Sequence, residues 1–234
     1  SASDAMPPQA TTPVPEGLDY DMWLGPAFPA PYTEKRVHPV EGYGRPGWMR
    51  IEEYCNGMIT NWGTHMNDIS QWVTGRERTG PISIKGSGEF SKGLWNTITD
   101  FKIEYEFADG VQQTYEIGRP YVRVEGTDGW LEAEEGKPLT ASSEELLHSK
   151  LEPGEVSFSE TLKDKADFLR AIKEDRETLE PVEVGHRTVS LCQLGLIAVN
   201  LGRPLKWDPT AERFQDDNAA DALLSRPIRA PWKI

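Results

Sequence analysis

The sequence predicts an α+β fold in which helices pack on one face of an open, mainly antiparallel β-sheet. Residues 101–107 alternate apolar and charged side chains without a fault, as a strand with one buried face does. Two glycine-containing turns, Asp109-Gly110 and Gly126–Gly129, join strand-like segments into hairpins. The last third of the chain instead repeats its apolar residues at helical spacing, so we expect helices to cover one face of the sheet.

The N-terminal part divides into two segments of different composition. Residues 1–16 have prolines among Ala, Ser and Thr, which predicts a disordered linker or the remnant of a tag. Residues 17–234 are expected to form one domain. The first part of that domain, up to Arg50, is rich in aromatic residues and prolines without a clear period, which is typical of an irregular arm packed on a surface.

A helix is expected after Gly63, running to about Thr74 and ending at Gly75. The period then changes to alternation, which predicts five or six strands in one antiparallel sheet. The expected strands begin near Ile82 and continue with residues 101–107, 111–117, 121–125 and 130–133.

Two helices are expected in the last third. The first follows Thr161, which forms a candidate capping pair with Asp164. Its amphipathic stripe consists of Leu162, Ala166, Leu169 and Ile172. The second, Thr188–Leu201, is apolar nearly all round and predicts a buried helix that ends at Gly202. From Trp207 onward we expect a loop-rich tail.

Composition restricts the class of partner. The net charge of −13 argues against nucleic acid or an anionic membrane surface, because both require clustered Lys and Arg. No apolar run is long enough to span a bilayer. Cys55 and Cys192 give neither a disulfide framework nor a metal-ligand spacing, so we expect buried free thiols and no metal.

The segment with the clearest chemistry is residues 57–68. Asn61, His65 and Asp68 lie four and then three residues apart, so on a helix all three share one face. A lone histidine near a helix start is often only a structural hydrogen-bonding group. Its two polar neighbours favour a catalytic role, because a catalytic imidazole needs a partner that fixes its tautomer. We therefore take His65, Asn61 and Asp68 as candidate catalytic residues.

A glycine-rich loop is the one candidate for nucleotide binding. Gly42–Gly47 matches the pattern G-x-G-x-x-G, which binds dinucleotides only between a buried strand and a helix. Here Pro39 interrupts any preceding strand and Pro46 stands where the helix would form. We therefore expect a plain loop and no cofactor-binding residue in this chain.

Several long segments, in the right order, resemble the C-terminal domain of the Gfo/Idh/MocA family, which includes glucose–fructose oxidoreductase and inositol dehydrogenase. The resemblance is to a bacterial subgroup and runs from about residue 16 to the end. The matching segments are Gly17–Ala27, Gly57–Trp72, Glu125–Trp130, His186–Gly195 and Leu224–Trp232.

This resemblance implies a two-part enzyme. Family members join a Rossmann domain, which binds NAD or NADP, to an α+β domain whose open sheet often forms the oligomer interface. They interconvert hydroxyl and carbonyl groups of sugars, cyclitols or their derivatives. His65 matches the histidine that takes or relays the hydroxyl proton, and Asp68 matches a trailing acid. Asn61 stands where the family usually has Asp, and an amide adds no negative charge beside the imidazole.

The resemblance implies that this chain is the substrate-binding and oligomerisation half of an NAD(P)-dependent oxidoreductase. We expect a carbohydrate-like substrate, a homo-oligomer through the sheet, and a missing N-terminal Rossmann domain that would hold NAD or NADP. The chain starts with Ser1 rather than Met, which suggests a cut polypeptide. Alone it is expected to bind no cofactor and to be inactive. Candidate aromatic contacts for the sugar are Trp62, Trp48 and Tyr32, which could equally be packing residues.

Two alternatives stay open at this point. The chain could be a non-catalytic sugar-binding or scaffold module, which a native start near Ser1 in the gene would favour. It could also belong to an NAD-assisted lyase or glycoside-cleaving enzyme of the same family, which an Asn61→Asp comparison would probe. The compartment is open between the bacterial cytoplasm and the periplasm.

Overall fold

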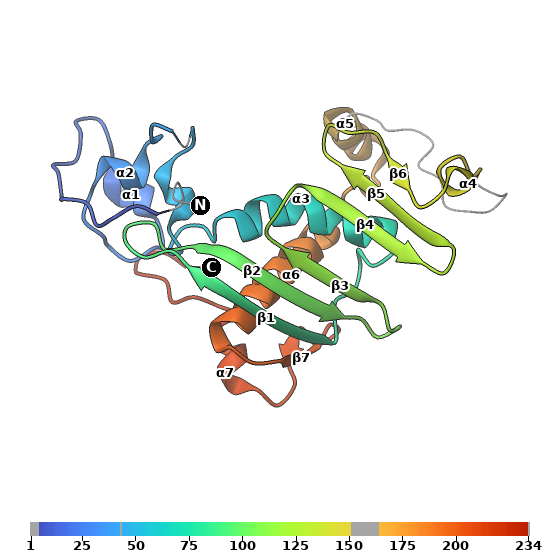
Figure 1. Ribbon diagram of the computed structural model, residues 1–234. Coiled ribbons are helices and arrows are strands. Elements are labelled where there is room, and N and C mark those ends of the chain that lie inside the picture. Colours follow the sequence, from blue (N-terminus) through green and yellow to red (C-terminus); the bar gives the residue numbers. More distant parts are fainter. Residues whose placement is uncertain (1–4, 43, 151–163, 234) are drawn as a thin grey trace.

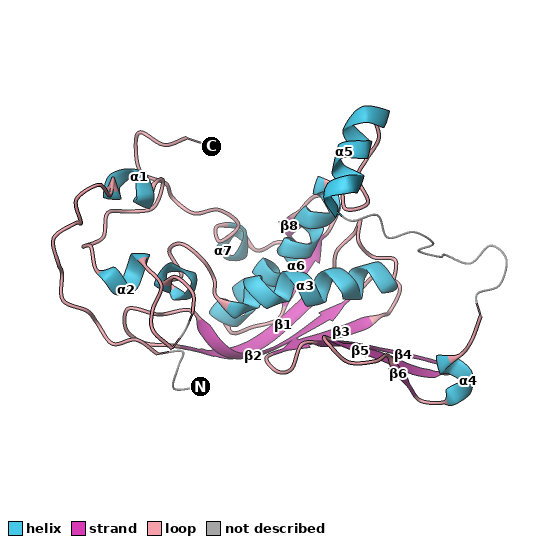
Figure 2. Ribbon diagram, turned by 90° about the horizontal axis from the view of Figure 1, so that it is seen from above, coloured by secondary structure: helices cyan, strands magenta, loops and turns pink. Residues whose placement is uncertain are grey.

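A five-stranded sheet covered by helices on one face, with a three-stranded sheet beyond its edge, makes up most of the molecule (Figures 1 and 2). The computed structural model describes residues 5–42, 44–150 and 164–233. The elements are α1 Tyr20–Leu24, α2 Glu34–Val37, the 3₁₀ helix η2 Gly47–Arg50, α3 Met58–Val73, β1 Ser83–Phe90, β2 Ile98–Glu106, β3 Gln112–Glu116, β4 Tyr121–Gly126, β5 Gly129–Glu134, β6 Thr140–Ala141, α4 Glu144–Leu147, α5 Asp164–Glu174, α6 Val182–Leu201, β7 Leu205–Asp208, β8 Arg213–Phe214 and α7 Asn218–Asp221. The α+β prediction is confirmed.

The strands form two sheets rather than the single sheet expected from the sequence. The larger has the order β3-β2-β1-β7-β8 and the smaller the order β4-β5-β6, with antiparallel pairing throughout. Both predicted hairpins, β2–β3 and β4–β5, are present. The expectation of one sheet fails between β3 and β4. Pro120, which has no N–H to donate, stands directly before β4, and a cavity separates the two strand edges.

The hydrophobic core lies between the larger sheet and helices α3 and α6. Ile103 on β2, Ile84 on β1 and Leu191 on α6 are each at most 1% exposed. Figure 2 shows α3 and α6 together on one side of the sheet, and no helix of the described residues lies on the other face. That uncovered face is polar: Lys85 and Lys102 both pair with Glu104. The alternation in β2 therefore separates an apolar inner face from a charged outer face, as the sequence predicts.

Two buried tyrosines join the sheet to the helices in the same way. Tyr115 of β3 donates its hydroxyl to the main-chain carbonyl of Ile59 in α3, at 2.9 Å. Tyr105 of β2 donates to the carbonyl of Leu191 in α6, at 2.7 Å. In each helix a glycine stands four residues after the accepting carbonyl. A Cβ at Gly63 would lie 2.4 Å from the Tyr115 hydroxyl, and a Cβ at Gly195 would lie 2.5 Å from the Tyr105 hydroxyl.

Helix α3 begins earlier than the sequence predicts. The expected start after Gly63 is wrong, because the helix starts at Met58 and Gly63 lies inside it. Gly57, with φ +71°, makes the sharp entry instead. A glycine usually weakens a helix interior, but here the missing side chain gives room to Tyr115 and to the Cys192 sulfur.

The last third is helical as expected, with differences at its ends. Helix α6 is longer than predicted and ends at Gly202, whose left-handed backbone lets its N–H bond the carbonyls of Ala198 and Val199. Helix α5 is present, while Thr161 and Leu162 lie outside the described residues. The tail, expected to be loop-rich from Trp207 onward, also contains the end of β7, the two-residue strand β8 and the short helix α7.

In the predicted stripe of α5, Leu169 and Ile172 are 58% and 64% exposed, so these two side chains are not packed in the core. The buried positions of this helix are Asp167 and Ala171. Asp167 accepts bonds from Arg176 and from the Leu179 N–H, which fix the turn after the helix.

The aromatic-rich arm, residues 17–50, packs at one end of the molecule (Figure 1). Val40 and Ile51 form a small core with Trp95 of the β1–β2 loop. The C-terminal tail returns to the arm, where Arg229 bonds the carbonyls of Ala27 and Asp21. Within the predicted linker, Met6 pairs with Trp95 and the Thr12 N–H bonds the carbonyl of Tyr32. The domain boundary at residue 16 stays a prediction.

The two tyrosine contacts lead to a prediction that compares two glycines of α6. Gly195→Ala is expected to destabilise the fold by about 1–3 kcal/mol, because the new methyl group displaces Tyr105 and Ile103. Gly185→Ala is expected to be neutral or to stabilise by up to about 1 kcal/mol, because nothing lies within 4 Å of its added Cβ. Urea unfolding of both variants measures the difference. Equal midpoints would contradict the close approach at Gly195.

Candidate functional site

Helix α3 places its buried and its candidate catalytic side chains on opposite sides. Its buried residues are Ile59, Gly63, Asn67 and Gln71, spaced four apart along one face. His65 is two residues from Gly63, so it projects about 200° around the helix from the side that meets the sheet. His65 is exposed, and Asn61 and Asp68 are partly buried beside it. The structure therefore brings the three predicted residues together on the side of α3 that faces away from the sheet.

His65 and Asn61 each make a side-chain contact on this side of α3. The indole of Trp62 lies against the His65 ring, with 5.6 Å between the centroids. The Asn61 carbonyl oxygen accepts a hydrogen bond from the Arg45 guanidinium at 3.4 Å. Sequence reasoning missed Arg45, which lies in the glycine-rich loop that we expected to be a plain loop. The only sign of this contact in the sequence is that the loop contains a positively charged residue, Arg45.

Asp68 is positioned by α6. Its carboxylate accepts a hydrogen bond from the Thr188 hydroxyl at 3.0 Å, and Thr188 in turn accepts one from the Gln71 amide at 2.9 Å. In another contact between α3 and α6, the side-chain amide of Asn67 donates a hydrogen bond to the Cys192 sulfur at 3.3 Å. Burial raises the pKa of this thiol to about 12, so it stays protonated near neutral pH, and its role is packing.

Asp68 lies near other carboxylates, which affects its charge. Burial raises the pKa of Asp68, and Glu77 adds to the effect, while the Thr188 bond and His65 act in the opposite direction. Burial also raises the pKa of Glu180, and Asp68 and Glu77 contribute to that rise. The ionised carboxylate of Asp68 is therefore less stable here than in water.

The three aromatic candidates for substrate contact lie in different surroundings. Trp62 is partly buried next to His65. Trp48 is partly buried in η2, three residues after Arg45. Tyr32 is only 5% exposed, and its hydroxyl pairs with His38 at 2.9 Å. Its ring meets Tyr20 edge to face within the arm. The structure thus places Trp62 with the catalytic candidates and Tyr32 inside the arm.

The glycine-rich loop does not fit a dinucleotide. Pro39 pairs with Pro46, so the loop closes on itself and continues into the four-residue 3₁₀ helix η2. A dinucleotide site needs a strand before the loop and a full helix after it. Gly47 has a packing reason instead, since a Cβ there would lie 1.8 Å from the carbonyl oxygen of Lys35.

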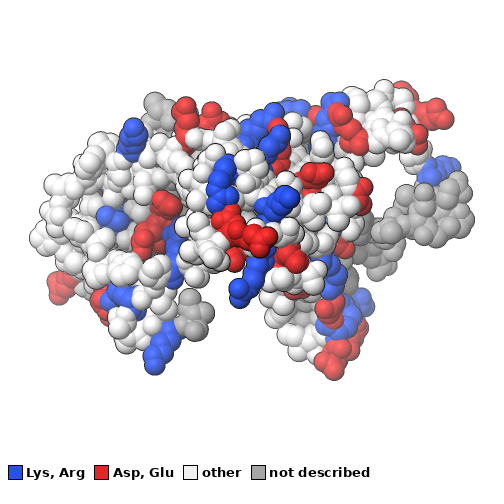
Figure 3. All heavy atoms as spheres, turned by 90° about the horizontal axis from the view of Figure 1, so that it is seen from below, with Lys and Arg blue, Asp and Glu red and all other residues white. Residues whose placement is uncertain are grey.

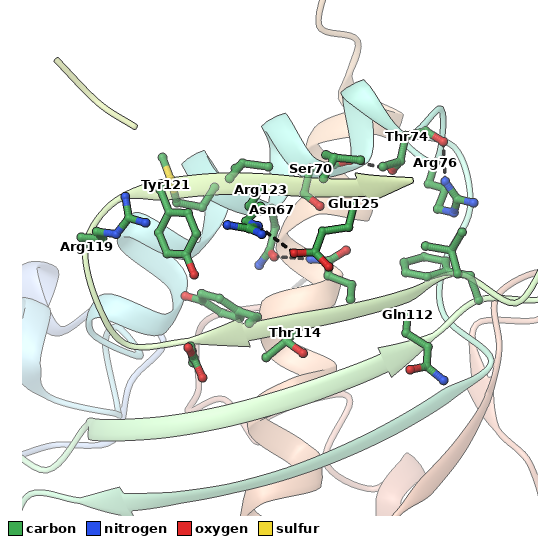
Figure 4. A pocket seen from close by; sticks show the side chains of 18 residues that line it. Asn67, Ser70, Thr74, Arg76, Gln112, Thr114, Arg119, Tyr121, Arg123 and Glu125 are labelled. Carbon is green, nitrogen blue, oxygen red and sulfur yellow. Dashed lines mark hydrogen bonds and ion pairs between the residues drawn. The ribbon is translucent and has the colours of Figure 1, made fainter. Parts of the chain in front are cut away.

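A cavity of about 420 Å³ lies on another side of α3, between the facing edges of β3 and β4 (Figure 4). Asn67 and Ser70 of α3, Gln113 of β3, and Tyr121 and Arg123 of β4 are among its lining residues. Figure 4 shows Tyr121 projecting from β4 toward β3. None of the six residues predicted as site residues lines this cavity. Sequence reasoning missed it because it depends on the separation of two sheets.

Neither the distribution of surface charge nor the arrangement of possible metal ligands adds much to the description of the candidate site. On the side of the molecule drawn in Figure 3, acidic and basic side chains are interspersed among the described residues. Within the same described residues, no group of three or more His, Cys, Asp and Glu side chains is arranged to hold a metal ion. Helices of the described chain also lack the combination of length and hydrophobicity that a membrane span requires.

Asp68→Asn is expected to raise the melting temperature at pH 7 by up to about 3 °C. Because the pKa of Asp68 is raised in the folded protein, protonation of this carboxyl contributes its full stability below the ordinary carboxyl pKa of about 4. That contribution is lost as the pH rises through the pKa that Asp68 has in the folded state. The increase in melting temperature caused by Asp68→Asn should therefore disappear toward pH 4. Thermal unfolding between pH 4 and pH 8 measures it, with the exposed Asp128→Asn as the control. A gain that grows as pH falls would contradict the burial effect.

The chain has the same fold as several solved oxidoreductases. An aldose–aldose oxidoreductase from Caulobacter crescentus, complexed with glycerol, matches with a TM-score of 0.51 and 17% identity, over 70% of this chain and 52% of that one. The WlbA dehydrogenase from Bordetella pertussis, in complex with NADH and UDP-GlcNAcA, matches with a TM-score of 0.52 and 11% identity, over 74% and 51%. An oxidoreductase domain protein from Kribbella flavida matches with a TM-score of 0.50 and 14% identity, over 73% and 54%.

The chain thus spans about half the length of these solved relatives. A search of curated proteins found no match. The sequence profile described as "Oxidoreductase family, C-terminal alpha/beta domain" matches residues 6–234, which is nearly the whole chain. This chain therefore belongs to the Gfo/Idh/MocA oxidoreductase family, as its C-terminal alpha/beta domain.

Proposed function

We propose that this chain is the substrate-binding half of an NAD(P)-dependent oxidoreductase that acts on a hydroxyl group of a sugar, a cyclitol or a derivative. The observation that carries the proposal is the open face of α3. His65 is exposed there, and Asn61 and Asp68 beside it are only partly buried, so this face is open to solvent. Oxidation of an alcohol needs an enclosed site, so this face needs a second domain over it.

Exposed apolar side chains on the same side of the molecule support a covering domain. Helix α5 projects from the helix layer on the side away from the sheet (Figure 2). Phe168 and Ile172 on this helix are 56% and 64% exposed, and Val182 at the start of α6 is 91% exposed. Soluble proteins usually bury such a group of large apolar side chains against a partner. The match covers only about half of each of these solved relatives, so they have room for such a domain.

In the proposed reaction His65 accepts the proton of the substrate hydroxyl, since its exposed imidazole can reach a ligand above α3. Asp68, held by Thr188, supplies negative charge beside the imidazole as the proton arrives. Asn61, with its carbonyl oxygen on Arg45, directs its amide N–H groups toward a substrate hydroxyl. Trp62 offers a ring face to the sugar, and we assign Tyr32 to packing within the arm.

The hydride acceptor belongs to the other domain in this proposal. The Gly42–Gly47 loop of this chain does not fit a dinucleotide, so no residue here is assigned to NAD or NADP. When bound by its own domain, the nicotinamide would supply the hydride-accepting carbon. This chain would then supply the proton acceptor and the groups that orient the alcohol.

His65→Ala is expected to lower kcat by about 10²–10⁴-fold, in a protein that joins this chain to its nucleotide-binding half. The fall should appear mainly in kcat, because the imidazole acts in the proton transfer rather than in ground-state binding. Reduction of NAD or NADP in the presence of sugars and cyclitols measures it. His148→Ala, an exposed histidine paired with Glu144 on α4, is the matched control. Equal turnover in His65→Ala and the parent would favour the non-catalytic module.

The uncovered face of the larger sheet is the proposed interface for a homo-oligomer. Its outer positions carry Lys85, Lys102 and Glu104 in ion pairs, so two copies related by a two-fold axis could exchange these pairs.

Glu104→Lys is therefore expected to shift the protein toward the monomer, because it places like charges across the proposed interface. Sedimentation velocity at micromolar concentration measures the shift, and Glu145→Lys on the exposed surface of α4 is the control. A parent protein that is already a monodisperse monomer would contradict this interface.

A further inference from the structure

The cavity between β3 and β4 is separate from the open face that carries His65. Its floor on α3 is made by Met66, Asn67 and Ser70, and its walls come from β3 and β4. Ser70 is five residues from His65, which places the two side chains about 140° apart around the helix. A ligand in the cavity would therefore contact α3 from a different side than a substrate at His65.

The three arginines that line the cavity each have a carboxylate partner. Arg123 bonds the carboxylate of Glu125 at 2.7 Å, and Arg76 pairs with Asp109. Arg119 pairs with Glu132 and Glu134. Because each of these arginines already has a carboxylate partner, the described residues leave no unpaired cation in the cavity to attract a phosphate or a carboxylate ligand. Its walls favour a neutral ligand.

Several uncharged polar groups around the cavity have hydrogen-bonding capacity left. Within the described chain, the hydroxyls of Ser70 and Tyr121 make no hydrogen bond, and neither does the side-chain carbonyl oxygen of Gln113. The Gln113 amide is oriented by its bond to Asn67, at 2.8 Å. In the same part of the chain the Nε–H of Arg76 is buried without a partner. A buried donor without a partner is destabilising, and a ligand oxygen that accepts from it would relieve that cost.

Aromatic rings complete the lining. Tyr115 of β3, Tyr121 of β4 and Phe107 are among the lining residues. The Arg76 guanidinium lies 5.4 Å from the centroid of the Phe107 ring. The Arg119 guanidinium lies 3.9 Å from the Tyr121 ring centroid and holds that ring in place. Rings together with hydroxyl and amide groups are what a sugar ring needs, since it has apolar C–H faces and polar edges. The volume of about 420 Å³ is within the range of small-molecule sites.

We propose that this cavity is a second binding site for a neutral monosaccharide or cyclitol, on the side of α3 away from the His65 face. Tyr121 stacks on the ring and bonds one of its hydroxyl groups through the phenol hydroxyl. Ser70, Gln113 and the Arg76 Nε–H bond its other hydroxyl groups. The site makes no use of a nucleotide or of His65. It therefore stands or falls independently of the proposed oxidoreductase function.

The test is a titration of this chain with glucose, xylose and myo-inositol, followed by calorimetry and by changes in the tyrosine ring signals in NMR spectra. We expect binding in the parent. Ser70→Trp fills the cavity and should weaken binding at least tenfold. Tyr121→Phe removes one hydroxyl and should weaken it about two- to tenfold. Ser225→Trp, an equal substitution on the exposed tail, should leave the affinity within twofold.

The outcomes separate the two sites. The cavity site is supported if Ser70→Trp loses ligand binding with an unchanged melting temperature and Tyr121→Phe binds the ligand more weakly than the parent. Should Ser70→Trp unfold the protein, Tyr121→Phe against the Ser225→Trp control decides alone. Binding that survives both cavity variants but disappears in His65→Ala overturns the cavity site and leaves the proposed function standing. No binding of any of the three ligands at tens of millimolar also overturns it.

Discussion

The contact on which the rest of the structure depends is a tyrosine hydroxyl bonded to a helix carbonyl above a glycine. It occurs twice, from Tyr115 to Ile59 over Gly63 and from Tyr105 to Leu191 over Gly195. Burial raises the pKa of both phenols, so each stays a hydrogen-bond donor. The carbonyl of residue i also accepts the helical N–H of residue i+4, so the tyrosine can approach only where residue i+4 has no side chain. The two helices are thereby fixed on the sheet in rotation as well as in position.

This fixed rotation decides what α3 presents to its surroundings. With Gly63 against Tyr115, Asn67 and Gln71 must face α6, where they meet Cys192 and Thr188. His65 is then directed away from the sheet, and Asp68 lies at the edge of the α3–α6 contact, within reach of Thr188. An exposed imidazole beside a carboxylate held by Thr188 thus follows from packing on the opposite side of the same helix. A substitution at Gly63 would act on the candidate site without touching it.

The sequence predicts the parts of this arrangement that depend on local pattern. The alternation in residues 101–107 and the apolar helix before Gly202 are both found, because burial of one face imposes the period directly. Gly63 was misread as a helix start, since its role appears only when Tyr115 is brought against it from 52 residues away. The split into two sheets and the Arg45–Asn61 hydrogen bond also depend on tertiary structure. Neither the pairing of strand edges nor a hydrogen bond from an irregular arm produces a periodic pattern in the sequence, so neither could be predicted from it.

The two sides of α3 differ in what they could do chemically. The His65 face is open and has an ionisable base, an amide and a carboxylate that burial already makes less stable as an ion. Such a face can move a proton, but it cannot exclude water without another domain. The β3–β4 cavity is partly enclosed and its arginines are paired with carboxylates, so it can hold a neutral ligand. One helix therefore separates the proposed reactive surface from the proposed binding pocket. Asn67, bonded to both Gln113 and Cys192, is the residue through which occupancy of that pocket would reach the α3–α6 contact that holds Asp68.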